Sequence, residues 1–197
     1  NVNNSKVYTL YYAFFLIPLM ITMIGVMFFF VFKVLTYETN SPNDYLTDIQ
    51  IGSATKRWQA AFELSKILSN SNRVPKDKVF MEKMINLYKK SINDDPMVRT
   101  YLAMAMGCTG HKEFGPSLME GLKDRDAVTR LAAIKSLGNI KYVSAIKGIK
   151  EFLKEKYSSE ERLAAVISLG NIGDKSVIID LQNILDDEEP NIRWDAA

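Results

Sequence analysis

The sequence predicts an all-α protein in which one transmembrane helix precedes an α-solenoid of stacked helical hairpins. Three observations support this fold class. A long uncharged apolar segment lies near the start of the chain, apolar residues recur at helical spacing through the rest, and an arginine-containing motif returns about every 31 residues. The chain therefore contains two physically different parts.

Charged residues are distributed very unevenly along the 197-residue chain. The first forty residues contain only Lys6, Lys33 and Glu38, whereas the remaining 157 carry 23 basic and 22 acidic side chains. The larger part is thus nearly neutral and has no basic block, so the electrostatic attraction that drives nucleic-acid binding is weak. We expect no nucleic-acid partner.

Residues that carry metal or catalytic chemistry are scarce. The single cysteine, Cys108, cannot form an internal disulfide, and the single histidine, His111, cannot build a zinc site alone. These two residues lie three positions apart, as a cysteine nucleophile and its base could, but no third orienting group accompanies them. The sequence also has no phosphate-binding loop and no His-Glu-x-x-His helix. We therefore expect no metal, no cofactor, no catalytic residue and no enzyme activity.

Residues 7–32 are 26 consecutive positions without a charge. As a helix this segment is roughly 39 Å long, which exceeds the bilayer core of about 30 Å. Aromatic rings and lysines at its ends are typical of membrane interfaces. We predict an N-terminal transmembrane anchor, residues 1–38, that contacts the bilayer through residues 7–35. The anchor residues we single out are Tyr8, Tyr11, Tyr12, Phe28, Phe29, Phe30, Phe32 and Lys33.

A cleaved signal peptide is the competing interpretation of this segment. Its apolar region would be about 7–15 residues long and end in small residues, whereas this one ends Phe-Phe-Phe-Val-Phe-Lys. A single-pass anchor fits better. Lys56 and Arg57 give the long side a small excess of positive charge, which favours a cytoplasmic solenoid. The frequent lysine, asparagine and isoleucine suit an AT-rich bacterial genome, and so we expect a bacterial inner membrane.

Residues 39–43 collect turn formers and are predicted to be a linker, and residues 44–197 then repeat a helical unit about five times. The repeated arginines are spaced by 42, 31, 32 and 31 residues. A glycine follows eight residues after each of the three middle arginines, where we expect a left-handed helix C-cap. The arginines are Arg57, Arg99, Arg130, Arg162 and Arg193, and the glycines are Gly107, Gly138 and Gly170.

Each unit is predicted to be a pair of helices that cannot bury its apolar surface alone. The first helix has one apolar stripe, such as Val143, Ile146 and Ile149. An acidic or proline-containing turn follows, where carboxylates and proline suit the start of the second helix. The second helix carries paired alanines that allow close approach of a neighbour. Stacking of the units then gives a continuous core, and the stacked units together form a solenoid.

These repeats resemble the HEAT-repeat family, specifically the PBS-lyase HEAT-like repeats, of a membrane-anchored bacterial type. The resemblance covers roughly residues 44–197, and its most specific part is 130–197, where Arg-x-Ala-Ala-x-x-x-Leu-Gly-Asn-Ile recurs. It implies that the arginines of the middle units bond to turns between repeats and to acidic groups such as Asp95, Asp126 and Glu160. The fifth unit stops at Ala197 inside its second helix. We therefore expect the native chain to extend past Ala197 and to begin before Asn1.

Two interpretations of the recurring arginines stay open. They could line a groove for acidic peptides or phosphates, or they could hold the repeats together, as the resemblance implies. The aromatic residues beside them could be interface anchors or core residues. The methionines Met97, Met104 and Met106, together with Met81 and Met84, are expected to pack in the core. The candidate partner-binding residues are Arg57, Trp58, Arg99, Tyr101, Arg130, Arg162, Arg193 and Trp194.

The function predicted from these features is that of a membrane-anchored scaffold that binds a protein partner, itself membrane-associated, through the solenoid. An accessory or regulatory subunit of a bacterial membrane complex, such as an ABC-type exporter, is the alternative. A lyase-type enzyme is a third possibility, suggested only by the name of the repeat family. The sequence does not identify the partner, the binding face or the oligomeric state.

Overall fold

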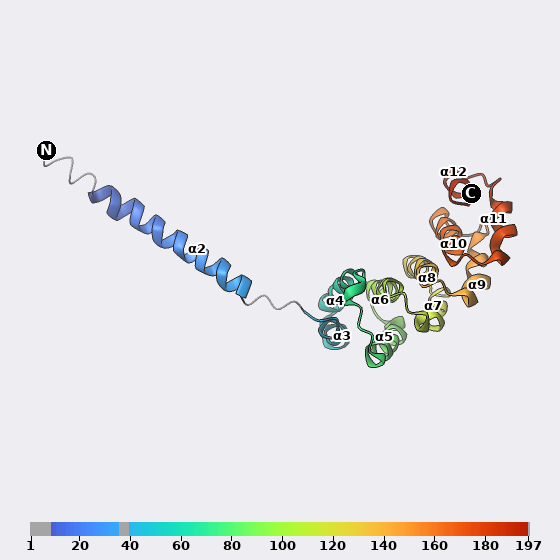
Figure 1. The fold of residues 1–197 in the computed structure, drawn as a ribbon, viewed down its shortest axis with the longest axis horizontal. Coiled ribbons are helices and arrows are strands. Elements are labelled where there is room, and N and C mark those ends of the chain that lie inside the picture. Colours follow the sequence, from blue (N-terminus) through green and yellow to red (C-terminus); the bar gives the residue numbers. More distant parts are fainter. Residues whose placement is uncertain (1–8, 36–39, 197) are drawn as a thin grey trace. The chain divides into compact units, whose positions relative to one another are not determined.

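The computed structural model describes residues 9–35 and 40–196 (Figure 1). The chain divides into two compact units, residues 1–39 and residues 40–197. The described residues form helices and contain no strand, so the predicted all-α class is confirmed. The helices of the second unit are α3 (Pro42–Ile51), α4 (Ala54–Leu68), α5 (Lys78–Lys90), α6 (Pro96–Cys108), α7 (Gly115–Gly121), α8 (Ala127–Asn139), α9 (Ile146–Lys150), α10 (Ser159–Ile172), α11 (Ile178–Ile184) and α12 (Pro190–Ala196).

The first unit contains one continuous helix, Thr9–Leu35, which is long and apolar enough to cross a membrane. It includes a π-helical turn, η1 (Tyr12–Leu16), followed by α2 (Ile17–Leu35). The predicted anchor residues within it have exposed side chains, and the Tyr11 and Phe15 rings stack with centroids 5.8 Å apart. Tyr8 lies outside the described residues. A signal sequence near an N-terminus can have the same length and composition. The helix is therefore a candidate membrane span by these two properties alone.

In the second unit the helices pair as hairpins, and the second helices of successive hairpins pack directly on one another. These second helices are α4, α6, α8, α10 and α12, and they form one row (Figure 1). The first helices α3, α5, α7, α9 and α11 form the other row. Short 3-10 turns precede three of the first helices, such as η4 (Lys112–Phe114) before α7. The predicted solenoid of helical hairpins is confirmed.

The core lies between the two rows and continues through the hairpins. Small residues occupy the contacts between second helices, because the paired alanines of α4, α8 and α10 are all buried. Larger side chains such as Leu64, Leu102 and Leu137 fill the space toward the first helices and are fully buried. A second, smaller cluster around Val166, Ile184 and Ile192 closes the last hairpin.

Side-chain caps set the start of the second helices, as the acidic turns predict. Asp95 accepts the backbone N–H of Met97, and Asp126 accepts that of Thr129. α3 begins at Pro42, inside the segment expected as a linker, because Ser41 and Asp44 form a reciprocal capping box. Hydrogen bonds from Ser41 hold the pKa of the Asp44 carboxyl below its usual value.

The expectation of left-handed glycines at 107, 138 and 170 is wrong by three residues. These glycines are helical, and the left-handed positions are Gly110, Lys141 and Gly173, with φ of 73°, 52° and 69°. A side chain at Gly107 would meet Ser136, and one at Gly138 would lie 2.7 Å from Ser168 Cα. Gly107 and Gly138 therefore allow close approach of the next second helix, whereas nothing lies within 4 Å of a Cβ at Gly170.

We predict that Gly138→Ala destabilises the solenoid while Gly170→Ala does not. The added methyl group at 138 would clash with Ser168, whereas nothing lies within 4 Å of a Cβ at Gly170. Overpacking of this kind costs about 1–3 kcal/mol, and removal of an unconstrained helical glycine gains up to about 1 kcal/mol. Chemical denaturation of both variants measures the difference. Equal stabilities would contradict a role for Gly138 in helix approach.

Candidate functional site

The recurring arginines form a chain of ion pairs between successive repeats. In each of the first four repeats the arginine of the second helix reaches an acidic residue of the following repeat. Their guanidinium groups are partly or largely buried, and Arg99 is only 3% exposed. The pairs are Arg57 with Asp94, Arg99 with Asp124 at 2.6 Å, Arg130 with Glu161 at 2.7 Å, and Arg162 with Asp187.

The same guanidinium groups also bond to backbone carbonyls of their own repeat. Arg57 and Arg99 donate to the carbonyls of Ile49 and Tyr88, near the ends of the preceding first helices, at 3.1 and 2.6 Å. Arg193 donates to two carbonyls of its own turn, at residues 187 and 188. Each arginine thus satisfies carbonyls that a helix end or turn leaves unpaired. The arginine side chains that were candidates for partner binding are therefore held by internal contacts.

The acidic partners differ from those that the family resemblance implied. Asp95 and Asp126 cap the second helices, so their carboxylates are already used by backbone N–H groups. Glu160 is exposed, and its neighbour Glu161 receives the bond from Arg130 instead. The turn residue Asp124 takes the equivalent role for Arg99. The spacing of the sequence did not show which acidic residues cap helices and which pair with arginines, because acidic residues occur at both kinds of position.

Arg99 rests on an aromatic ring as well as on its ion pair. Its guanidinium carbon lies 4.2 Å from the centroid of the Tyr88 ring, in cation–π geometry. Tyr88 is fully buried, and its hydroxyl has no hydrogen-bond partner among the described residues. Burial raises the pKa of Tyr88 to about 12. This stacking could not be predicted from the sequence, because Tyr88 is eleven residues from Arg99 and lies on a different helix.

The aromatic candidates occupy three different environments. Trp58 is half-buried and packs against the core. Tyr101 is half-buried on α6, and its ring packs edge-to-face on Phe62 with centroids 5.1 Å apart. Trp194 on α12 is 82% exposed. The structure therefore leaves Tyr101 and Trp194 accessible and covers much of Trp58.

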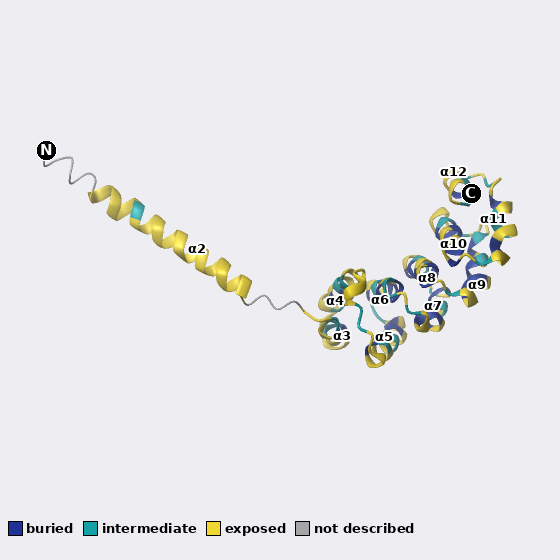
Figure 2. Cartoon of the chain, viewed as in Figure 1, coloured by how far each residue is buried: buried dark blue, intermediate teal, exposed yellow. Residues whose placement is uncertain are grey.

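Apolar side chains line the solvent-facing side of the row of second helices. Met97, Tyr101 and Met104 share one side of α6, since spacings of four and three residues place side chains on one helix face. Exposed positions also occur on the neighbouring second helices (Figure 2). We call this surface the inner stripe and define it as Phe62, Met97, Tyr101, Met104, Val128, Ile167 and Trp194.

The prediction that the methionines pack in the core is correct for Met106 and wrong for Met97 and Met104. Met106 is fully buried, but Met97 and Met104 are each 41% exposed on the inner stripe. A pocket of about 190 Å³ opens beside them, between α6 and α8. Its walls include Met97, Tyr101 and Val128, and the stripe is therefore indented at this point.

Cys108 and His111 have different neighbours. The Cys108 sulfur lies 3.4 Å from the Ser69 hydroxyl, across the contact between α6 and α4. His111 packs edge-to-face on Phe114, and its Nδ1 is 3.9 Å from a Glu113 oxygen. Within the part of the chain that the structure describes, no group of three or more His, Cys, Asp or Glu residues has metal-binding geometry.

Comparison with known proteins identifies the repeats. The family model described as HEAT repeats matches residues 81–166, and the model described as PBS lyase HEAT-like repeat matches residues 161–187. Residues 81–187 of this chain therefore consist of HEAT-type repeats. No curated protein matches the chain.

Several solved structures share its fold, and two illustrate the similarity. One is the complex of CpcE and CpcF of phycocyanin lyase from Nostoc sp. PCC7120, with a TM-score of 0.66, 20% identity and coverage of 82% of this chain. This chain covers 64% of that chain, which is less than two thirds of its length. The other is the crystal structure of an engineered protein, with a TM-score of 0.58, 17% identity, and coverage of 80% and 77% of the two chains.

The expectation of no enzyme activity is overturned by these comparisons. A repeat model named after PBS lyase matches residues 161–187, and the same fold occurs in a phycocyanin lyase complex at 20% identity, so this fold does not exclude an enzyme. Our expectation was based on the motifs of other enzyme classes, such as phosphate loops and zinc helices. The absence of those motifs does not bear on a lyase built from helical repeats.

We predict that Arg99→Met lowers the free energy of unfolding by about 3–5 kcal/mol, because it leaves Asp124 and the Tyr88 carbonyl without their partner. Arg125→Met is the matched control. That arginine is exposed in the same turn, and its loss should change stability by less than about 0.5 kcal/mol. Urea denaturation of both variants tests the claim. A small effect at both positions would show that the pair contributes little.

Stability should decrease between about pH 10 and pH 12 because of Tyr88. Its folded pKa is raised to about 12, so over this range the unfolded chain releases a proton that the folded chain keeps. Tyr88→Phe removes this titration without removing a hydrogen bond. We expect the variant to match the parent near neutral pH and to lose less stability at alkaline pH, measured by urea denaturation across pH. Identical alkaline profiles would contradict a buried, neutral Tyr88.

Proposed function

We propose that this protein is a membrane-anchored HEAT-repeat scaffold that binds a protein partner through the inner stripe. The observation that carries the proposal is that exposed apolar side chains of neighbouring second helices meet, since Phe62 packs on Tyr101, and Met97, Tyr101 and Val128 line one pocket. Isolated exposed apolar residues are ordinary, but a contiguous apolar surface marks an interaction site. HEAT repeats as a class support protein–protein interaction.

The stripe favours a partner with an apolar helix face or extended apolar segment. Its aromatic members, Tyr101 and Trp194, are residue types that dominate binding energy at interfaces. Methionine side chains are flexible, so Met97 and Met104 can adapt to a partner's shape. The neighbouring arginines contribute indirectly, because their ion pairs fix the spacing between second helices and thus the spacing of the stripe.

The helix Thr9–Leu35 supports the anchoring half of the proposal. An anchor confines the solenoid to the membrane surface and raises its effective concentration toward membrane-bound partners. We place the solenoid on the cytoplasmic side of a bacterial inner membrane, as the weak basic excess after the span favours. The exposed rings of Phe28, Phe29 and Phe30 offer a contact to another membrane protein, which supports the alternative of a subunit in a larger membrane complex.

Affinity purification of the full chain from native membranes, with Met104→Glu and Tyr101→Glu on the inner stripe, tests this function. The expected result is loss of a stoichiometric partner, because a charge in an apolar contact costs several kcal/mol. Ile179→Glu is the control, since Ile179 is exposed on the first helix α11. Loss of the partner in the control as well, or retention in every variant, would refute the inner stripe as the binding surface.

A second candidate is a lyase-related role, favoured by the match to the phycocyanin lyase complex. The test is direct binding of phycocyanin to the purified full chain, together with the absorption spectrum of the mixture. A stable complex with a changed spectrum would favour this role over a scaffold. No binding would remove its only specific support.

A further inference from the structure

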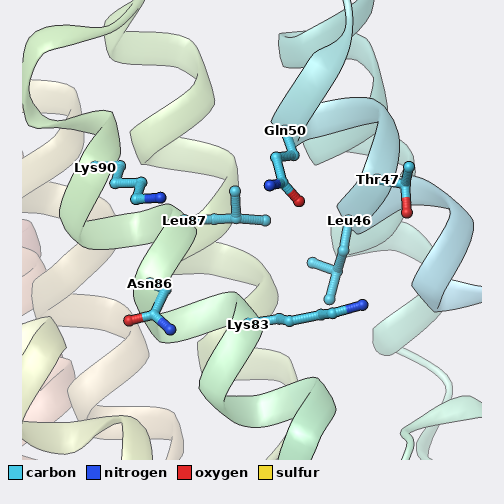
Figure 3. A pocket seen from close by; sticks show the side chains of 7 residues that line it. All are labelled: Leu46, Thr47, Gln50, Lys83, Asn86, Leu87 and Lys90. Atoms are coloured by element: carbon cyan, nitrogen blue, oxygen red, sulfur yellow. The ribbon is translucent and has the colours of Figure 1, made fainter.

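A polar pocket lies between the first helices α3 and α5 (Figure 3). The inner stripe, in contrast, is formed by the second helices. Its volume is about 210 Å³. Leu46 and Leu87 face each other across it, and polar side chains surround them in the view of Figure 3. The polar lining residues are Thr47, Gln50, Lys83, Asn86 and Lys90.

The lining supplies hydrogen-bond donors and positive charge. Two ammonium groups, two carboxamides and a hydroxyl face the space, and no carboxylate belongs to its walls. Lys83 and Lys90 are exposed and form no ion pair among the described residues. This chemistry is complementary to an anion.

Acidic residues near the pocket are already paired with other cations. Asp48 on α3 pairs with Lys56 at 2.8 Å, and Glu82 on α5 lies 3.7 Å from Lys78. The two pocket lysines are therefore left uncompensated, and the surface around them is positive.

The segment that contains Lys150 and Lys154 is also rich in lysine, but these two lysines form ion pairs. Lys150 pairs with Asp180 at 2.5 Å, and Lys154 pairs with Glu151 at 2.6 Å. Those lysines are largely neutralised by neighbours. Free positive charge beside a pocket is thus a feature of the first two repeats.

The length of the connecting chain limits how far α3 can lie from the end of the apolar helix. The apolar helix ends at Leu35 and α3 begins at Pro42. Whatever the arrangement of the residues between them, seven peptide steps span at most about 25 Å. The α3 side of the pocket is therefore tethered within reach of the lipid headgroups, where anionic lipids attract basic side chains.

We propose that the pocket between α3 and α5 binds the phosphate-bearing headgroup of an anionic membrane lipid. This inference rests on the proposed membrane anchoring. Lys83 and Lys90 supply the charge, Gln50 and Asn86 donate to headgroup oxygens, and Leu46 and Leu87 form the apolar floor. Binding would orient the first repeats on the membrane and leave the inner stripe for the protein partner.

The experiment uses the full chain in nanodiscs of phosphatidylcholine, with and without phosphatidylglycerol. Hydrogen exchange of residues 78–90 reports on the pocket, and native mass spectrometry reports the retained lipid. We expect protection of α5 and retention of phosphatidylglycerol only in the anionic discs. The variant Lys83→Gln/Lys90→Gln should bind phosphatidylglycerol about tenfold more weakly or worse. Lys147→Gln/Lys175→Gln, which removes two exposed lysines elsewhere, should leave binding unchanged.

Each failure has its own signature. Rapid exchange of residues 9–35 in every nanodisc would refute the anchoring, and the lipid site with it. Protected residues 9–35 together with equal lipid binding by both double variants would refute the lipid site alone. Inorganic phosphate added to neutral discs is a further arm. Protection of α5 by phosphate as strong as that by phosphatidylglycerol would assign the pocket to a soluble anion and overturn the lipid proposal.

Discussion

The solenoid depends on the ion pair that joins each arginine to the following repeat. A single hairpin buries only part of its apolar surface and has to pack against the next hairpin. Because apolar packing has little directionality, a hydrogen-bonded ion pair is needed to fix the orientation of the two hairpins. Arg99 does this with one hydrogen bond to Asp124 of the following repeat, one to the Tyr88 carbonyl of its own repeat, and the Tyr88 ring beneath its guanidinium group. The equivalent pairs at Arg130 and Arg162 repeat the geometry with different acids. Apolar packing supplies most of the favourable free energy, and the pairs determine the register in which it is obtained.

Close backbone approach is the second constraint, and it acts at the same junctions. The helical glycines at 107 and 138 leave space that Ser136 and Ser168 of the next helix occupy. Ser136 also donates to the Ala103 carbonyl at 2.8 Å, and Thr100 bonds to Thr129. The polar groups at the junction of α6 and α8 are thus paired across it, whereas the buried Ser168 hydroxyl has no hydrogen-bond partner among the described residues. The result is a row of helices whose solvent-facing side chains stand at regular intervals.

The repeat period, the hairpins and the apolar helix could be predicted because each depends on local patterns. The apolar run needs only a count of residues, and the hairpins follow from helical spacing interrupted by acidic turns. The role of the glycines could not be predicted in the same way, since a glycine at a C-cap and one at a helix crossing look alike until Ser168 is placed against Gly138. The same applies to Met104, whose exposure depends on which side of α6 the neighbours cover. Choosing between Glu160 and Glu161 as the partner of Arg130 required the relative rotation of two helices, which no local pattern contains.

The difference between the two rows of helices has a mechanical consequence. The second helices meet at glycine, serine and alanine, whereas bulkier buried side chains such as Phe80 on α5 and Phe114 just before α7 come from the row of first helices. Each repeat is therefore a wedge, and a small rotation at one junction displaces every repeat beyond it in proportion to their distance. A chain built in this way acts as a lever: a ligand that opens or closes a single wedge near one end changes the position of the other end by a much larger amount.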